Sequence, residues 1–133
     1  MNEHSDVVYP TEDEIIRLNK EILEKVVVRK ADRHKLLSRA QITMAISGAK
    51  EHPGDLYYKA AILLYGLLRS HPFDSGNRRT GMAAVFSFLT TNGQNPKIIE
   101  DSSILLGIRH NYYSLEEIKS WLQGNAIKAF RRS

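Results

Sequence analysis

The sequence predicts an all-α protein built as one bundle of about six helices. Residues 56–68 and 82–89 are apolar over lengths and spacings typical of buried helices. Two further segments open with capping boxes, one beginning at Thr11 and one at Ser114, and each is followed by a helical apolar pattern. We therefore expect the two apolar helices at the centre, with shorter amphipathic helices around them.

The length of 133 residues is that of one domain, enough to bury about two-thirds of the surface of the unfolded chain. We expect this domain to span residues 11–124. Residues 1–10 are interpreted as an N-terminal tail, and residues 125–133 as a basic, solvated C-terminal tail.

The first helix is predicted to run from the box at Thr11 to about Val27. Its apolar residues recur at helical spacing, at Ile15, Leu18, Ile22 and Val26. A charged loop follows, in which Asp32 is the expected N-cap of a second helix. That helix should include Leu36 and continue to Ile46 before the pattern breaks at residues 48–54.

The third helix is predicted to start after Asp55 and to end near Ser70. Asp55 is a good N-cap residue, and Pro72 disfavours the α conformation at His71. His71 is therefore expected at the rim of this long apolar helix.

The fourth helix should begin near Gly76, because Asp74 and Ser75 are both favourable N-cap residues and glycine allows unusual backbone geometry. Asn92 and Gly93 form a typical C-terminal stop. A short fifth helix is predicted from residues 101–103 to Ile108, then a turn at residues 109–111. The last helix should run from Ser114 through Leu122.

The polar stretch between the two central helices has the residue types that handle phosphate. A helix start offers unpaired N–H groups and about half a positive charge. Asn77, Arg78 and Arg79 add donors and charge, so this helix start is suited to a di- or triphosphate. His71, beside it, can take up a proton near neutral pH. A base beside a phosphate site indicates transfer of a phosphate-containing group to a hydroxyl.

The same stretch resembles the motif of the Fic/Doc (Fido) family, His-Pro-Phe-x-(Asp/Glu)-(Gly/Ala)-Asn-(Gly/Lys)-Arg. Six residues match place for place: His71, Pro72, Phe73, Gly76, Asn77 and Arg79. The resemblance covers about residues 9–124 and is closest to the short death-on-curing (Doc) branch. It implies a Fido-like bundle with the active loop between the two central helices.

The resemblance implies an enzyme that uses ATP and Mg²⁺ to modify a hydroxyl of a cytosolic protein substrate. His71 is then the catalytic base, while Gly76, Asn77, Arg78 and Arg79 bind the nucleotide phosphates. Pro72 is expected to be a rigid stop and Phe73 a buried anchor. Branch similarity further implies a toxin paired with an antitoxin protein. Residues 48–54 occupy the place of the family's target-binding flap, or form an ordinary connector.

Three departures from the motif matter for the chemistry. Ser75 stands in the family's acidic metal-binding place, and Asp74 falls one place early, so Asp74 is either a Mg²⁺ ligand or an N-cap. Arg78 stands where AMP-transferring enzymes usually have glycine and Doc has lysine. Met82 replaces the second arginine of AMP-transferring enzymes. The departures at Arg78 and Met82 favour phosphorylation over AMP transfer. The departure at Ser75 also allows a catalytically weakened interaction module.

Two side chains of the motif each have two possible roles. Asn77 either orients a phosphate or braces the loop, and Arg78 either contacts phosphate or points to water. The net charge of +4 also allows a basic nucleic-acid binder, but no helix is densely basic, so no nucleic acid is expected.

The sequence is compatible with a cytoplasmic protein, and we expect that location. Cysteine is absent, which excludes a thiolate nucleophile and a cysteine-ligated zinc. No signal peptide is evident at the start. No apolar run approaches the roughly 18 residues that span a bilayer, so no membrane partner is expected.

Overall fold

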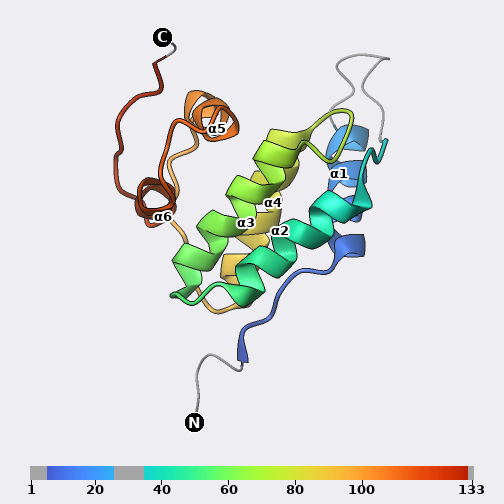
Figure 1. The fold of residues 1–133 in the computed structure, drawn as a ribbon, viewed down its shortest axis with the longest axis horizontal. Coiled ribbons are helices and arrows are strands. Elements are labelled where there is room, and N and C mark those ends of the chain that lie inside the picture. Colours follow the sequence, from blue (N-terminus) through green and yellow to red (C-terminus); the bar gives the residue numbers. More distant parts are fainter. Residues whose placement is uncertain (1–5, 26–34, 132–133) are drawn as a thin grey trace.

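A computed structural model describes residues 6–25 and 35–131, which form helices and no sheet (Figure 1). The helices are α1 Glu12–Lys25, α2 Arg39–Glu51, α3 Leu56–Ser70, α4 Asn77–Thr91, α5 Ser102–Arg109 and α6 Leu115–Leu122. The prediction of an all-α bundle of six helices is confirmed. Within the described part of the chain, no helix has both the length and the apolar character needed to cross a bilayer.

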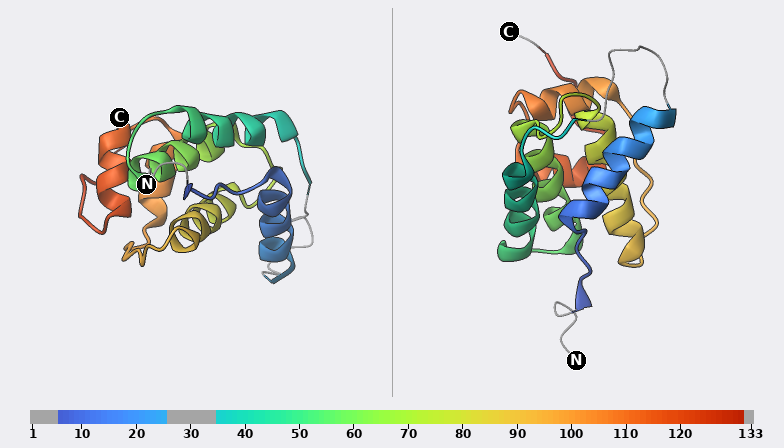
Figure 2. Two further views of the ribbon diagram at one scale, coloured as in Figure 1. Left: turned by 90° about the horizontal axis from the view of Figure 1, so that it is seen from below. Right: turned by 90° about the vertical axis from the view of Figure 1, so that its right-hand side faces the viewer.

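Helix α3 lies at the centre of the bundle and packs against α2, α4, α5 and α6, while α1 packs on α4 and α2 (Figures 1 and 2). A helix that is apolar on most of its surface is stable only in such a place. Gly66 lets α2 approach closely, because a Cβ there would lie 2.9 Å from the Cβ of Ala45. The central position of α3 places its C-terminal end, and therefore His71, among several helices.

Most helix starts form as their residues predict. The Asp55 carboxylate accepts a hydrogen bond of 2.9 Å from the Tyr58 N–H at the start of α3. Asp101 caps α5, and the capping box at Ser114 is complete. At Thr11 the Thr11 hydroxyl accepts from the Glu14 N–H, and the Glu14 carboxylate accepts from that hydroxyl instead of from the Thr11 backbone.

The predicted start of the second helix is wrong. Leu36 lies outside α2 and forms an isolated antiparallel bridge with Phe73, and Ser38 is the N-cap. The backbone of this segment pairs with the loop after α3, and that tertiary pairing prevails over the helical pattern. The expected cap Asp32 and the expected helix end at Val27 lie outside the described residues.

The second helix also ends later than predicted. It continues through Gly48 to Glu51, so the connector to α3 is only residues 52–55. Lys59 explains the extension, since its buried ammonium donates to the Ala49 carbonyl at 2.9 Å and to the His52 carbonyl at 2.8 Å. A cation at these carbonyls stabilises the last turn of α2.

Both terminal segments pack onto the bundle. The Asn92 side chain exchanges two hydrogen bonds of 2.8 Å with the backbone of Val8. The Tyr113 hydroxyl donates to the Lys128 carbonyl, and Phe130 packs against the core. The C-terminal segment is therefore attached near Tyr113 and Phe130, while its basic residues Lys128 and Arg131 are exposed; Arg132 lies outside the described residues.

We expect Phe73→Ala to lower the free energy of unfolding by about 3–5 kcal/mol, because it leaves a cavity beneath the loop. Phe73 is 1% exposed. Phe86→Ala is the matched control, since Phe86 is 46% exposed and its truncation should cost about 1 kcal/mol or less. Urea unfolding of both variants measures the difference, and equal losses would contradict the role of Phe73 as a buried anchor.

Candidate functional site

The loop between α3 and α4 begins with a strained residue. His71 has φ 52° and ψ 60°, in the left-handed region that residues other than glycine rarely adopt. Neighbouring backbone holds it there: the Pro72 carbonyl accepts from the Leu37 and Ser38 N–H groups at 2.8 and 3.1 Å. The Asp74 N–H in turn donates to the Lys35 carbonyl. Strain of this kind persists only where surrounding contacts fix it, and such positions cluster at functional sites.

Asn77 closes the loop on itself. Its Oδ1 accepts from the Phe73 N–H at 3.0 Å, and its Nδ2 donates to the Phe73 carbonyl at 2.7 Å. The side chain is only 7% exposed. The structure therefore shows that Asn77 braces the loop. The alternative role, in which Asn77 orients a phosphate, stays a prediction.

A second buried amide, missed in the sequence, joins α1 to the loop. Asn19 is fully buried, and its Nδ2 donates to the Ser75 carbonyl at 2.9 Å and to the Thr80 hydroxyl at 3.0 Å. The sequence does contain a sign of this burial, because Asn19 lies four residues after Ile15 and four before Leu23, on the buried stripe of α1. A polar residue on such a stripe indicates a buried hydrogen-bond partner.

The predicted N-caps of α4 are wrong. Neither Asp74 nor Ser75 caps the helix; Gly76 does, with φ 78° and no side-chain hydrogen bond. The bond from Asn19 fixes the Ser75 carbonyl, and the next residue takes a conformation that favours glycine. Among the described residues, no side chain caps α4 at Gly76, so the start of α4 offers backbone N–H groups that lack intrahelical partners.

These residues surround a pocket of about 410 Å³ at the start of α4. Its lining comprises His71, Asp74, Ser75, Gly76, Asn77, Arg78, Arg79, Ser102 and Leu105. The structure thus brings all predicted site residues to one pocket except Pro72 and Phe73. These two belong to the loop but do not line the pocket, and Phe73 is buried. Helix α5 contributes Ser102 and Leu105, which the motif does not contain.

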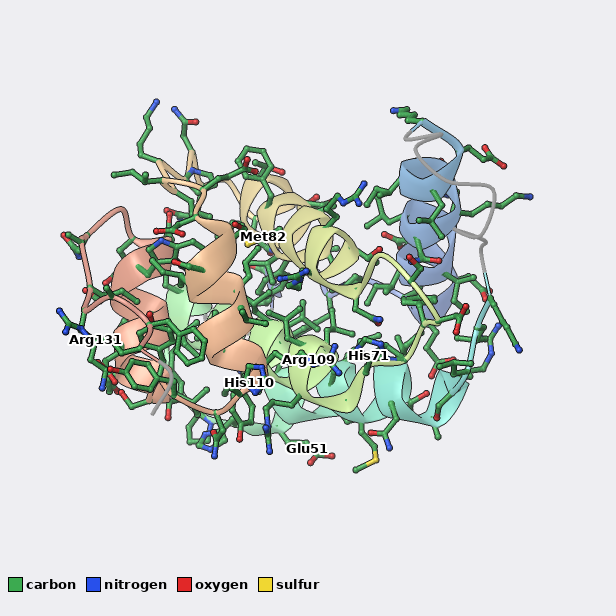
Figure 3. All side chains as sticks on the ribbon, turned by 90° about the horizontal axis from the view of Figure 1, so that it is seen from above. Glu51, His71, Met82, Arg109, His110 and Arg131 are labelled. Atoms are coloured by element: carbon green, nitrogen blue, oxygen red, sulfur yellow. The ribbon has the colours of Figure 1, made fainter. Side chains whose placement is uncertain are left out.

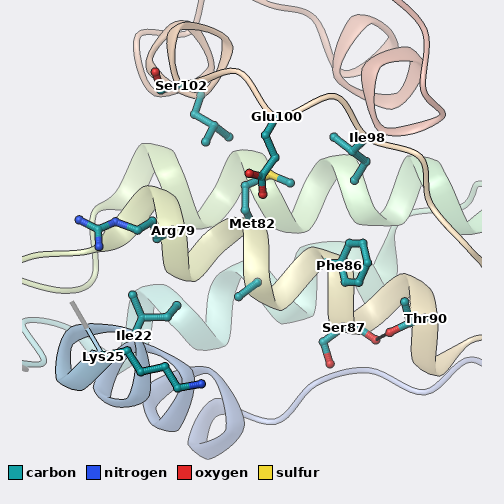
Figure 4. Close-up of a pocket in the computed structure, with 12 residues that line it drawn as sticks. Ile22, Lys25, Arg79, Met82, Phe86, Ser87, Thr90, Ile98, Glu100 and Ser102 are labelled. Carbon is teal, nitrogen blue, oxygen red and sulfur yellow. Dashed lines mark hydrogen bonds between the residues drawn. The ribbon is translucent and has the colours of Figure 1, made fainter.

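A larger groove of about 870 Å³ runs along α4 (Figure 4). Arg79, Ser102 and Leu105 line both spaces. The groove walls are mainly apolar, with Met82 and Phe86 on α4. The two spaces together therefore have Arg78, Arg79 and the start of α4 at one end and mainly apolar side chains along the rest.

His71 has a partner that the sequence did not indicate. Its Nδ1 lies 2.7 Å from Nη1 of Arg109, the last residue of α5 (Figure 3). A guanidinium only donates, so Nδ1 accepts this hydrogen bond and the imidazole is neutral. Arg109 was expected in a turn without a role; instead, α5 extends one residue further and carries it to the site.

The surroundings lower the pKa of His71. Burial is the main cause, the Arg109 guanidinium adds to it, and the Asp74 carboxylate opposes it. A base must be neutral to accept a proton. The site therefore keeps His71 in the protonation state that general-base chemistry requires.

Asp74 is the acidic residue of the pocket. Among the described residues, no group of three or more histidine or carboxylate side chains gathers that could hold a metal by itself. Mg²⁺ that arrives on phosphates needs only one or two protein carboxylates. The single carboxylate of Asp74, beside the start of α4, fits that smaller requirement.

The chain is similar to a known protein family. The model of the family described as "Fic/DOC family" matches residues 9–89, which include α1, α2, α3, the whole loop and most of α4. No curated protein matches the chain.

We expect an NMR titration to give His71 a midpoint below 6.5, because burial and Arg109 disfavour its charged form. In the urea-unfolded chain the midpoint should return to about 6.5. The unfolded chain then binds this proton more readily, so acidification below about pH 6.5 also lowers the free energy of unfolding. A folded midpoint equal to or above the unfolded one would show that the site does not hold His71 neutral.

Proposed function

The chain belongs to the Fic/DOC family, and on this premise we propose that it is a Doc-like transferase. It moves the terminal phosphate of ATP to a hydroxyl side chain of another protein. The observation that carries this proposal is the pocket itself, where His71, Arg78, Arg79 and the uncapped start of α4 face one space.

The residues have distinct roles in this reaction. His71 takes the proton of the acceptor hydroxyl, whose oxygen forms a bond to the γ-phosphorus. The bond from that phosphorus to the β–γ bridging oxygen breaks, and ADP leaves. Arg79 and the N–H groups of α4 stabilise the charge on the transferred group, where most catalysis of phosphoryl transfer lies.

The site suits a nucleotide better than a simple phosphate. The pocket continues into the apolar groove, whose walls are appropriate for a nucleoside. Mg²⁺, when bound, neutralises phosphate charge. Asp74 is the residue that would hold it, next to Ser75 in the family's acidic place.

Phosphorylation is favoured over AMP transfer by two positions. Arg78 places a long cation on the pocket, as Doc does with lysine. Met82 lines the groove in the place of the second arginine of AMP-transferring relatives, so that position supplies no cation for a nucleotide lying the other way. AMP transfer is the alternative and requires the α-phosphate at His71.

The proposed setting is the cytoplasm, with a protein as the substrate. By similarity to the Doc branch, the chain is proposed to act as a toxin that an antitoxin segment inhibits by covering the groove. The short connector at residues 52–55 is proposed either as a flap that aligns the target or as a simple link.

The direct test incubates the protein and a host extract with ATP labelled at either the α- or the γ-phosphate. We expect transfer of the γ-label, reduced about 10²–10⁴-fold in His71→Ala because the base is lost. His110→Ala is the matched control and should transfer normally, since His110 lines neither pocket nor groove. Transfer of the α-label would establish AMP transfer instead, and transfer of neither label would contradict both.

Calorimetry of ATP binding with and without Mg²⁺ separates an active enzyme from a weakened interaction module. We expect Mg²⁺ to tighten binding, and Asp74→Asn to remove most of this gain, because Asp74 is the carboxylate at the pocket. Ser75→Asp restores an acid in the family's place and should increase the Mg²⁺ effect. If Mg²⁺ changes nothing in the unmodified protein, catalysis by this chain becomes untenable and the interaction module remains.

A further inference from the structure

We propose that Arg109 is a movable phosphate ligand that occupies His71 in the free protein and leaves it when a polyphosphate enters the pocket. The proposal assigns binding and control to a residue outside the family motif. It rests on the proposed function only in treating the pocket as a phosphate site.

The resting contact blocks the base. A neutral imidazole has one nitrogen with a free lone pair and one that carries the proton. Because Nδ1 accepts from Arg109 at 2.7 Å, Nε2 carries the proton. No ring nitrogen can then accept the proton of a hydroxyl, so His71 becomes a base only after Arg109 has moved.

The position of Arg109 allows it to reach the pocket. Ser102 and Leu105, which line the pocket, precede it by seven and four residues, so all three lie on one face of α5. Its hydrogen-bond partner His71 is itself part of the pocket wall. The backbone is fixed, because Arg69 Nη1 donates to the Arg109 carbonyl at 2.8 Å, while the Arg109 side chain is exposed. The Arg109 side chain can therefore turn from His71 toward the pocket while its backbone stays in place.

The electrostatics favour that movement when phosphate is present. Within the described ranges, no carboxylate lies at ion-pair distance from the Arg109 guanidinium. It is bonded instead to a neutral ring, beside a pocket that already carries Arg78 and Arg79. A charge-assisted, two-pronged bond to a phosphate is stronger than a bond to neutral imidazole.

Calorimetry with inorganic tripolyphosphate tests the inference without any catalytic step. We expect Arg109→Met to weaken binding about tenfold or more, because the charge-assisted contact with the phosphate is lost. Arg109→Lys keeps the charge and should retain most of the affinity. Arg17→Met, which removes an exposed arginine paired with Glu21 on α1, is the control and should bind within about twofold of the unmodified protein.

Nitrogen-15 NMR of the His71 ring, at about pH 8 where the ring is neutral, supplies the second measurement. In the free protein, Nδ1 should give the signal of an unprotonated, hydrogen-bonded nitrogen. Tripolyphosphate should shift this signal, and Arg109→Met should shift it without ligand.

The outcomes separate the two proposals. If tripolyphosphate binds the unmodified protein and Arg109→Met equally, and the Nδ1 signal does not change, the role of Arg109 is refuted and the phosphate site stands. If tripolyphosphate fails to bind the unmodified protein at all, the phosphate site and this inference fall together.

Discussion

The arrangement of the site depends on the left-handed backbone of His71. Pro72 stops α3 at this point, and the Pro72 carbonyl is held by two N–H groups of the segment before α2. This turn directs the chain across the end of α3 and returns it to start α4. With this turn in place, the imidazole and the start of α4 line the same pocket.

Two buried amides keep the loop in this shape without using the groups that a ligand needs. Asn77 satisfies the backbone of Phe73, and Asn19 satisfies the Ser75 carbonyl and the Thr80 hydroxyl. Among the described residues, no buried side-chain polar atom lacks a partner. Within the described part of the chain, no side chain caps the start of α4, which is the positive end of that helix.

Local patterns predicted the helices and the motif residues, because capping residues, proline and apolar periodicity act over a few positions. Local patterns gave wrong predictions where contacts between residues far apart in the sequence determine the structure. Leu36, predicted to lie in the second helix, pairs with Phe73 instead. Asn19 holds the Ser75 carbonyl, and the N-cap of α4 is the next residue, Gly76. Arg109 reached His71 across 38 positions of sequence, a contact that no local signal could reveal.

The central claim is that the terminal phosphate of ATP lies at the start of α4 beside His71. A crystal structure with Mg²⁺ and a non-hydrolysable ATP analogue tests it most directly. The account predicts the γ-phosphate at the first N–H groups of α4, with the nucleoside in the apolar groove along that helix. An α-phosphate facing His71, or an analogue bound away from this pocket, would contradict it.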